Sequence, residues 1–458
     1  MSLQEQFRQQ APAPLPPRSI HLPTPVETTL KNGLGIVVIP DVRLPLVSYR
    51  LAFRTGDAHD PNGLPGLTDL LTGLLSEGTK SHSSREIADL VAKMGATLSA
   101  GANSDYTTIA ASSLTKFHDQ IFELLADVAL NPLFPENEVK LIKENTRESL
   151  RQQRAQPSFL ATEMVSRIIF GQHPYAHIAP TLESLEATTR QRVIDFHRSQ
   201  FVPNNAVLVV AGDVDSDALI QRAEGLFSGW SPGELPPNDF PAPPARTSRS
   251  AYLVDRHGSA QSNIVIANGR SITRTSPDYF PMLLMHTVLG ANASSRLFMN
   301  LREEKGYTYG AYSSLDARRT AGSFRVSAEV RTPVTGESLK EFFYELNRIR
   351  NEPVSAKELE DAKSYLTGVF PIRLETQEGL IEQVVQIKML GLPDDYLQTY
   401  RQAIQDVRTE EMQRVANEYV RPDEAAVIIV GDGDEITRQV KPFAETVETY
   451  NTAGELLR

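Results

Sequence analysis

An internal repeat constrains the fold of this chain more than any other feature of its sequence. "FVPNNAVLVVAGDVD" at 201–215 aligns with "VRPDEAAVIIVGDGD" at 420–434, at a constant offset of 219 positions. Each copy predicts a buried, β-branched strand that follows a proline and stops at Gly-Asp. A weaker pair, "NPLFPENEVKLIKEN" at 131–145 and "NEPVSAKELEDAKSY" at 351–365, keeps the same order at an offset of 220. The chain is therefore predicted to contain two homologous halves of about 210–220 residues each.

A proline-rich stretch separates the two halves. The segment "SPGELPPNDFPAPPARTSRS" at 231–250 has a proline density that favours an extended linker over a packed element. We predict one domain at 25–232, a linker at 233–248 and a second domain at 249–450. Residues 1–24, rich in Pro and Gln, are predicted to form a disordered leader.

Within the first half, strands and helices mix without the strict alternation of a parallel fold. Apolar runs at 33–41 and 46–56 predict neighbouring strands, and 97–114 predicts two paired strands around "AGANSD". Helical spacing of apolar residues follows at 66–76 and 135–153. The expected fold class is α+β, with each half a mostly antiparallel or mixed sheet that carries helices.

Charge and composition exclude several classes of function. The chain has 46 basic and 57 acidic residues, a net charge of −11, which argues against general binding to nucleic acid or anionic membranes. The absence of cysteine excludes disulfides and thiolate chemistry. The first 19 residues lack the apolar region of a signal peptide. Their Pro-rich character favours an exported, periplasmic protein over a cytoplasmic one, and "MSL" is consistent with a replaced export signal.

The helix expected at 66–76 has an unusual polar face. Leucines form an apolar stripe, and the other face carries Asp69, Thr72 and Gly73 at i, i+3 and i+4. A glycine inside a helix costs roughly 1 kcal/mol relative to alanine, so its presence there requires a reason.

Common catalytic motifs are absent from the sequence. It contains no phosphate-binding glycine loop, no Gly-x-Ser-x-Gly elbow and no His-Glu-x-x-His pattern. His173 and His177 in "HPYAH" have the spacing of helical metal ligands, but Pro174 biases His173 away from helix. We therefore predict a structural role for this segment.

The repeat and several local patterns together resemble the pitrilysin-like M16 family of zinc peptidases, which includes mitochondrial processing peptidase and bacterial two-subunit peptidases. In the first half the resemblance rests on "NGLGIVVIPD", "GLPGLTDLLTGLLSEGT" and the stretch from "HPYAH" to "VVAGDVD". In the second half it rests on "LGANASSRLFMNLREEKGYTYGAYSS" and "VGDGD". The resemblance spans about 25–445 and implies a processing-peptidase-like fold whose two halves form one shell of a clamshell.

The resemblance implies that the zinc site of this family is degenerate here. In active members a His-x-x-Glu-His motif supplies two zinc ligands and the glutamate that polarises the zinc-bound water. By alignment those positions fall on Asp69, Thr72 and Gly73. The third ligand of the family, a glutamate, falls on Ser149, with Glu148 one position away. We therefore expect no zinc or other cofactor on this chain.

The second half keeps a different part of the family pattern. Active members need an arginine and a tyrosine from the half or subunit that lacks zinc, and Arg302 and Tyr309 stand at that spacing. The resemblance makes them catalytic residues acting on a partner's site. Asn292, Ser294 and Tyr307 are candidate substrate-binding positions. The residues alone also allow a purely structural interpretation, in which Arg302 pairs with neighbouring glutamates and Tyr309 packs into the sheet.

The leading hypothesis is a non-catalytic partner subunit of a heterodimeric zinc metallopeptidase. Its partner would carry His-x-x-Glu-His and the zinc, and its substrates would be extended peptides. The alternatives are a structural scaffold similar to the core subunits of respiratory complexes, and a homodimer that binds peptides without cutting them. An independent hydrolase built on Asp69 with His59, His82 or Glu148 has no supporting spacing.

Overall fold

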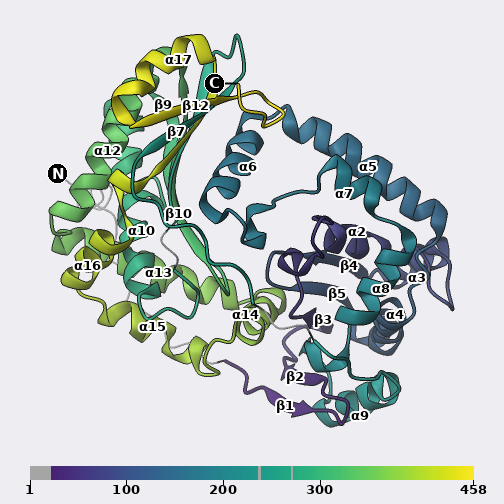
Figure 1. Ribbon diagram of the computed structural model, residues 1–458. Coiled ribbons are helices and arrows are strands. Elements are labelled where there is room, and N and C mark those ends of the chain that lie inside the picture. The colour runs from purple at the N-terminus through teal and green to yellow at the C-terminus, as the bar shows by residue number, and fades with distance from the viewer. Residues whose placement is uncertain (1–21, 236–238, 270–271, 458) are drawn as a thin grey trace, which may run out of the picture.

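The computed structural model describes residues 22–235, 239–269 and 272–457, and in it the chain forms two six-stranded sheets (Figure 1). The first sheet has the order β1-β2-β6-β3-β5-β4. Its strands are β1 (Val26–Thr29), β2 (Gly35–Pro40), β3 (Leu46–Phe53), β4 (Thr97–Ala102), β5 (Thr107–Leu114) and β6 (Ala206–Gly212). The second sheet has the order β12-β7-β11-β8-β10-β9. Its strands are β7 (Ser250–Asp255), β8 (Gln261–Asn268), β9 (Thr308–Ala317), β10 (Gly322–Arg331), β11 (Ala426–Gly431) and β12 (Thr446–Tyr450).

The two sheets have the same plan. The repeated segments form β6 and β11, which are the third strand of their sheets and are buried along their whole length. β6 runs parallel to β2 and antiparallel to β3, and β11 runs parallel to β7 and antiparallel to β8. The predicted α+β class with two homologous halves is confirmed.

Helices surround both sheets. Those of the first half are α2 (Leu67–Leu74), α3 (Ser84–Met94), α4 (His118–Leu130), α5 (Glu136–Arg154), α6 (Pro157–Phe170), α7 (Leu182–Ala187), α8 (Arg190–Gln200) and α9 (Ser216–Phe227). Those of the second half are α10 (Tyr279–Gly290), α11 (Arg296–Phe298), α12 (Thr335–Asn351), α13 (Ala356–Leu374), α14 (Gln377–Leu390), α15 (Tyr396–Asp406), α16 (Thr409–Tyr419) and α17 (Gly433–Val440). Several begin where the sequence offers a cap, as in α3, where Ser83 and Glu86 form a reciprocal capping box.

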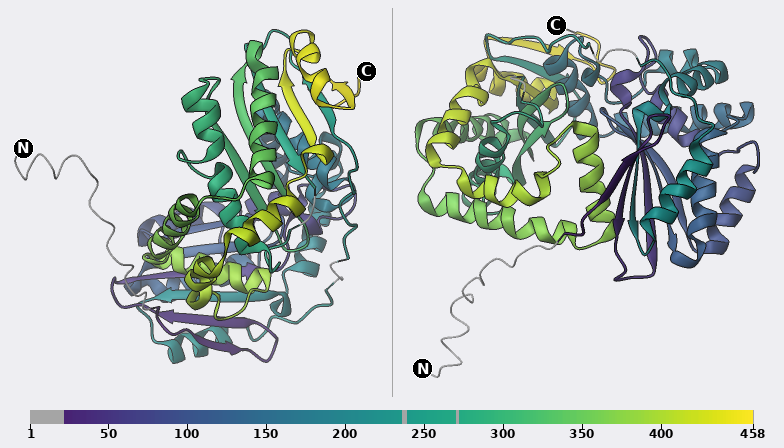
Figure 2. Two further views of the ribbon diagram at one scale, coloured as in Figure 1. Left: turned by 90° about the vertical axis from the view of Figure 1, so that its left-hand side faces the viewer. Right: turned by 90° about the horizontal axis from the view of Figure 1, so that it is seen from below.

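Each half contributes one helix to the sheet of the other. α6 packs on β8 and β11 of the second sheet, whereas α14, which starts 220 positions later, packs on β3 and β6 of the first (Figure 1). Leu380 and Val384 of α14 lie beside Ile39 of β2. Glu378 of α14 accepts a hydrogen bond from Ser48 (2.8 Å). The two lobes lie side by side (Figure 2), and this exchange joins their cores.

A buried hydrogen-bond network also connects the halves. The Tyr175 hydroxyl donates to the Asp105 carboxylate and accepts from the Thr320 hydroxyl (3.0 Å). His173 lies 3.2 Å from the same Thr320 hydroxyl, and burial lowers the pKa of His173 to about 4. The "HPYAH" segment forms a short 3-10 turn (η3, Pro174–Ala176) rather than a helix, which gives it the structural role predicted.

The leader predicted at 1–24 lies outside the described residues except for its last three positions. The prediction of export rests on this leader and therefore stays a prediction. The described parts of the linker, on either side of 236–238, contain no helix or strand. Within the described ranges, no helix is long and apolar enough to cross a membrane.

Candidate functional site

Helix α2 carries the degenerate motif, and a remote aspartate caps it. Its N-cap is Gly66, at φ +89°, which has no side chain to receive the first amide groups. Asp60 replaces that missing cap, because its carboxylate accepts from the amides of Gly66 (2.6 Å), Leu67 (3.1 Å) and Thr68 (2.9 Å). The predicted leucine stripe is buried in the core. Asp60 therefore fixes the start of the helix, and the stripe fixes its rotation.

The polar face of α2 is occupied by packing and local hydrogen bonds. The Thr72 hydroxyl donates to the main-chain oxygen of Asp69 (2.9 Å). A Cβ placed on Gly73 would lie 2.4 Å from the Cδ1 of Ile142, on α5. The glycine therefore has a structural reason, since it leaves room for α5 to pack against α2.

The residues at the expected zinc positions do not fit a zinc site. Ser149 is exposed on α5 and accepts from Gln153 (3.4 Å), while Glu148 pairs with Arg151 (3.3 Å). A catalytic zinc requires three histidine, cysteine or carboxylate ligands. An aspartate, a threonine, a glycine and a serine do not supply that set.

Asp69 instead lines a small acidic cavity of about 100 Å³ together with Asp57, Asp60 and His177. Oδ1 of Asp57 is buried and has no hydrogen-bond partner within the described chain. Burial, and then the neighbouring carboxylates of Asp69 and Asp60, raise the pKa of Asp57 to about 8. Burial raises the pKa of Asp60 to about 6, although hydrogen bonds from Thr68 and Gly66 oppose the rise. Sequence reasoning missed Asp57 and Asp60, whose signal is the acidic pair in "TGDAHDPNG" directly before the helix.

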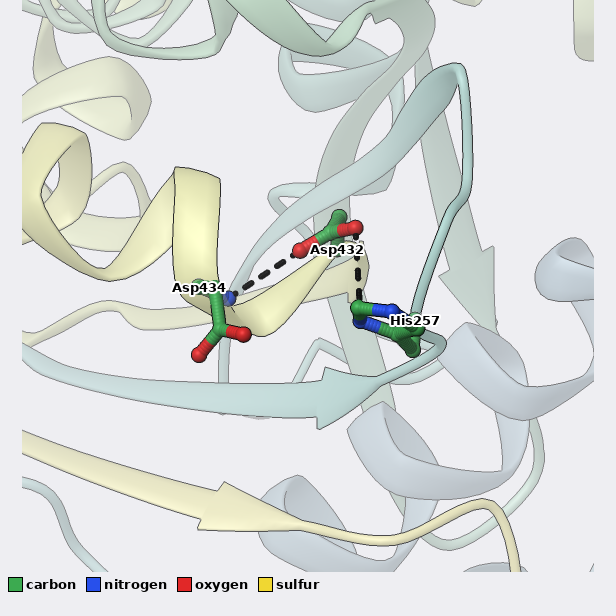
Figure 3. A group of neighbouring side chains, drawn as sticks. All are labelled: His257, Asp432 and Asp434. Carbon is green, nitrogen blue, oxygen red and sulfur yellow. Dashed lines mark hydrogen bonds and ion pairs between the residues drawn. The ribbon is translucent and has the colours of Figure 1, made fainter.

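In the described residues, one group of three His, Asp or Glu side chains lies close enough to share a metal ion. This group lies in the second half, away from α2. It consists of His257, Asp432 and Asp434 (Figure 3). Asp432 is the N-cap of α17, and its oxygens accept from the amides of Asp434 (3.2 Å) and Gly258 (2.6 Å). The positive end of the helix dipole favours carboxylates here and opposes a bound cation. We interpret this group as a helix cap.

Arg302 lies in an unusual helix in the second half. The sequence predicts a helix that runs from about Ser294 and ends near Arg302, and the structure has a helix over 296–304. The α-helix α11 lasts three residues and continues as a π-helix (η5, Met299–Glu304). Gly306 follows at φ +64° and allows the chain to reverse, so that the Tyr307 amide donates to the Leu301 carbonyl (3.0 Å). Arg302 is half-buried and forms no hydrogen bond or ion pair within the described chain. Short π-helices are frequent at functional sites.

A β-bulge directs Tyr309 into solvent. Ala328 of β10 pairs with Ala311 of β9, and Val330 pairs with Thr308, so two residues, Tyr309 and Gly310, stand opposite Glu329 alone. Without this bulge, Tyr309 would share the buried face of Ala311, whereas its side chain is 89% exposed. Bulges re-aim side chains in this way beside active sites.

The other candidate positions lie around these two residues. Two-residue periodicity predicts that Tyr307 and Tyr309 share a strand face, but Tyr307 precedes β9 and the bulge changes the alternation. Asn292 and Ser294 form the turn before α11, where the Asn292 side chain accepts from the Ser294 amide (2.9 Å) and hydroxyl (2.7 Å). The side chains of Arg302 and Tyr309 therefore have no hydrogen-bond or ion-pair partner in the described chain. They lie on η5 and β9, which pack against each other.

Family models match both halves of the chain. The model described as "Insulinase (Peptidase family M16)" matches residues 37–182, and "Peptidase M16 inactive domain" matches 187–366. Among curated relatives, "Uncharacterized zinc protease YmxG" of Bacillus subtilis is 22% identical, covering 89% of this chain and 98% of that protein. "Non-peptidase homolog YmxG" of Helicobacter pylori is 23% identical, covering 81% and 85%.

Solved structures show the same fold. A peptidase M16 inactive domain from Pseudomonas fluorescens superposes with a TM-score of 0.83 at 24% identity, covering 89% of this chain and 98% of that one. A protease from Helicobacter pylori also gives 0.83, at 20% identity and with coverage of 89% and 100%.

Proposed function

The chain belongs to the M16 peptidase family, and we propose that it is a non-catalytic subunit that supplies Arg302 and Tyr309 to a peptidase site on a second chain. The observation that carries the proposal is that these two side chains have no hydrogen-bond or ion-pair partner in the described chain. A π-helix presents one and a β-bulge presents the other, and neither is committed to a partner in the described chain. A residue with only a packing role would be buried or paired.

The first half supports the same proposal because it lacks the ligands of a zinc site. Asp69, Thr72, Gly73 and Ser149 do not provide a zinc donor set, and Ile142 packs where a side chain at Gly73 would project. The hydrolytic metal is therefore expected on a partner chain that carries His-x-x-Glu-His. The proposed assembly is a heterodimer in which this chain forms one shell.

The two side chains suit the hydrolysis of extended peptides. Attack on a peptide carbonyl develops negative charge on its oxygen, and a preorganised phenol such as Tyr309 can donate a hydrogen bond to it. The Arg302 guanidinium offers forked, charge-assisted hydrogen bonds to a peptide carbonyl or carboxylate. These residues would orient the substrate and stabilise the developing charge.

The experiment is reconstitution with the native partner. The chain is used to capture a His-x-x-Glu-His protein from its host, and the complex is assayed on extended peptides with and without this chain. Arg302→Ala and Tyr309→Phe should each lower kcat/KM by roughly 10²-fold, as removal of an oxyanion donor does elsewhere. Tyr344→Phe on α12 and Arg438→Ala on α17, both exposed, should leave activity unchanged.

Three outcomes would contradict the proposal. Full activity of both Arg302→Ala and Tyr309→Phe in the complex would remove the proposed role of the pair. Capture of respiratory membrane subunits without peptidase activity would support the scaffold alternative instead, and saturable peptide binding by the lone chain without turnover would support the binding homodimer.

A further inference from the structure

A large cavity in the first half is lined by residues of α3, α4 and α9. Figure 1 shows these helices on the side of the first half that is remote from the second half. Its volume is about 670 Å³, within the range typical of small-molecule sites. The apolar part of its lining consists of Leu90, Met94, Phe117, Leu124, Leu130 and Leu226. It shares no lining residue with the acidic cavity beside α2.

The walls select an alkyl chain over a peptide. The lining comes mainly from three helices, whose main-chain groups are hydrogen-bonded within each helix. A peptide placed there could pair its amide groups only with the few polar side chains of the lining, whereas an alkyl chain has no polar group to satisfy. The lining follows α4 from Phe117 to Leu130, a length of about 20 Å, which accommodates a chain of about twelve carbons.

The acidic groups of the cavity are already neutralised or hydrogen-bonded. The Asp127 carboxylate accepts from the Thr79 hydroxyl (2.5 Å) and the Asn131 amide (3.0 Å), and lies 3.3 Å from Nδ1 of His82. Glu123 forms an ion pair with Arg222. Neither carboxylate is free to bind a cationic ligand.

The cavity also has one unpaired cationic side chain at its rim. Lys93, at the exposed rim on α3, has no hydrogen-bond or ion-pair partner in the part of the chain that the structure describes. A cavity with an apolar wall and an unpaired ammonium at its rim is complementary to an amphipathic anion.

We propose that this cavity binds a single-chain carboxylate of the fatty-acid class. The alkyl chain lies among the leucines of α3, α4 and α9, and the carboxylate meets Lys93 at the rim.

The test is calorimetric titration of the full chain with dodecanoate, below its micelle concentration. We expect saturable binding of one molecule per chain. Lys93→Met should weaken binding about fivefold, the effect of losing an exposed ion pair. Leu90→Trp and Leu226→Trp, which place a ring in the cavity, should each weaken it by tenfold or more. Lys140→Met and Leu182→Trp, both exposed and outside the lining, are the matched controls and should bind as the parent does.

The ligand's charge provides the second arm. Dodecyltrimethylammonium has the same chain with a cationic head, and it should bind at least tenfold more weakly than dodecanoate. Absence of saturable dodecanoate binding would overturn the proposal. So would equal affinity for the two head groups, or unchanged binding by both tryptophan variants when their circular dichroism shows that they are folded.

Discussion

Ile142 of α5 packs into the space beside Gly73 of α2, where a Cβ would lie 2.4 Å from its Cδ1 atom. In catalytic members of the family, the resemblance places a zinc-binding histidine at the position of Gly73. Here Ile142 occupies the space that a side chain at position 73 would need, so a packing contact stands where the ligand would be.

This contact predicts coupling between the two residues. Gly73→Ala should gain about 1 kcal/mol of helix propensity, but the new methyl group forces Ile142 to shift, so the net change in the free energy of unfolding should be near zero. In an Ile142→Ala background the obstruction is gone, and the same substitution should stabilise the protein by about 1 kcal/mol. Urea unfolding of the four proteins measures the coupling. Strict additivity would mean that Ile142 moves aside at no cost.

The bulge at Tyr309 depends on one hydroxyl. Thr308 Oγ1 donates to the Glu329 carbonyl (2.7 Å) and accepts from the Gly310 amide (3.1 Å), so it holds both sides of the bulge. Thr308→Val should cost about 1 kcal/mol of stability and lower the activity of the reconstituted complex, because Tyr309 loses its fixed direction. The control is Thr162→Val, whose hydroxyl serves only an exposed bond within α6. If both variants keep full activity, the bulge does not position Tyr309.

The raised pKa of Asp57 predicts a pH-dependent stability. The folded state keeps this carboxyl protonated up to about pH 8, whereas an unfolded aspartate loses its proton near pH 4. The folded state therefore binds more protons between these values, and the stability present below about pH 4 is lost as the pH rises toward 8.

Asp57→Asn imitates the protonated acid and should remove this loss. The variant should be more stable than the parent by on the order of 2 kcal/mol at pH 9, and the difference should shrink toward pH 4. Thermal unfolding across this range measures it. The control is Asp89→Asn, at an exposed position on α3, whose stability should depend on pH in the same way as that of the parent. A constant difference between Asp57→Asn and the parent would show that the carboxyl does not titrate in this window.

Much of the fold could be predicted from the sequence, because the signals were local. Strands β6 and β11 followed from apolar runs bounded by proline and Gly-Asp, and the leucine stripe of α2 followed from helical spacing. The exchange of α6 and α14 could not be predicted, since an apolar face does not specify which sheet it covers. That choice is made by tertiary packing.

The same limit applied to the candidate site. The positions Asp69, Arg302 and Tyr309 were singled out by the resemblance to the M16 family. Their surroundings depend on residues distant in sequence: the room at Gly73 is set by Ile142, and the direction of Tyr309 by the strand that pairs with β9. The helix at Arg302 was predicted, but its π-helical hydrogen bonding, which depends on how this segment packs, was not.

The exchanged helix predicts that the first half cannot unfold alone. Val384 of α14 is 8% exposed and shares a core cluster with Val207 and Val209 of β6. Val384→Asp should cost 3 kcal/mol or more, because it buries a charge without a partner, and it should do so in a single transition that includes both sheets. Gln383→Asp, on the partly exposed side of the same helix, should cost less than about 1 kcal/mol. Hydrogen exchange at β6, a strand of the other half, is the decisive measurement: its amides should lose protection in Val384→Asp. If they keep the parent's protection while the second half loses its own, α14 does not stabilise the first sheet.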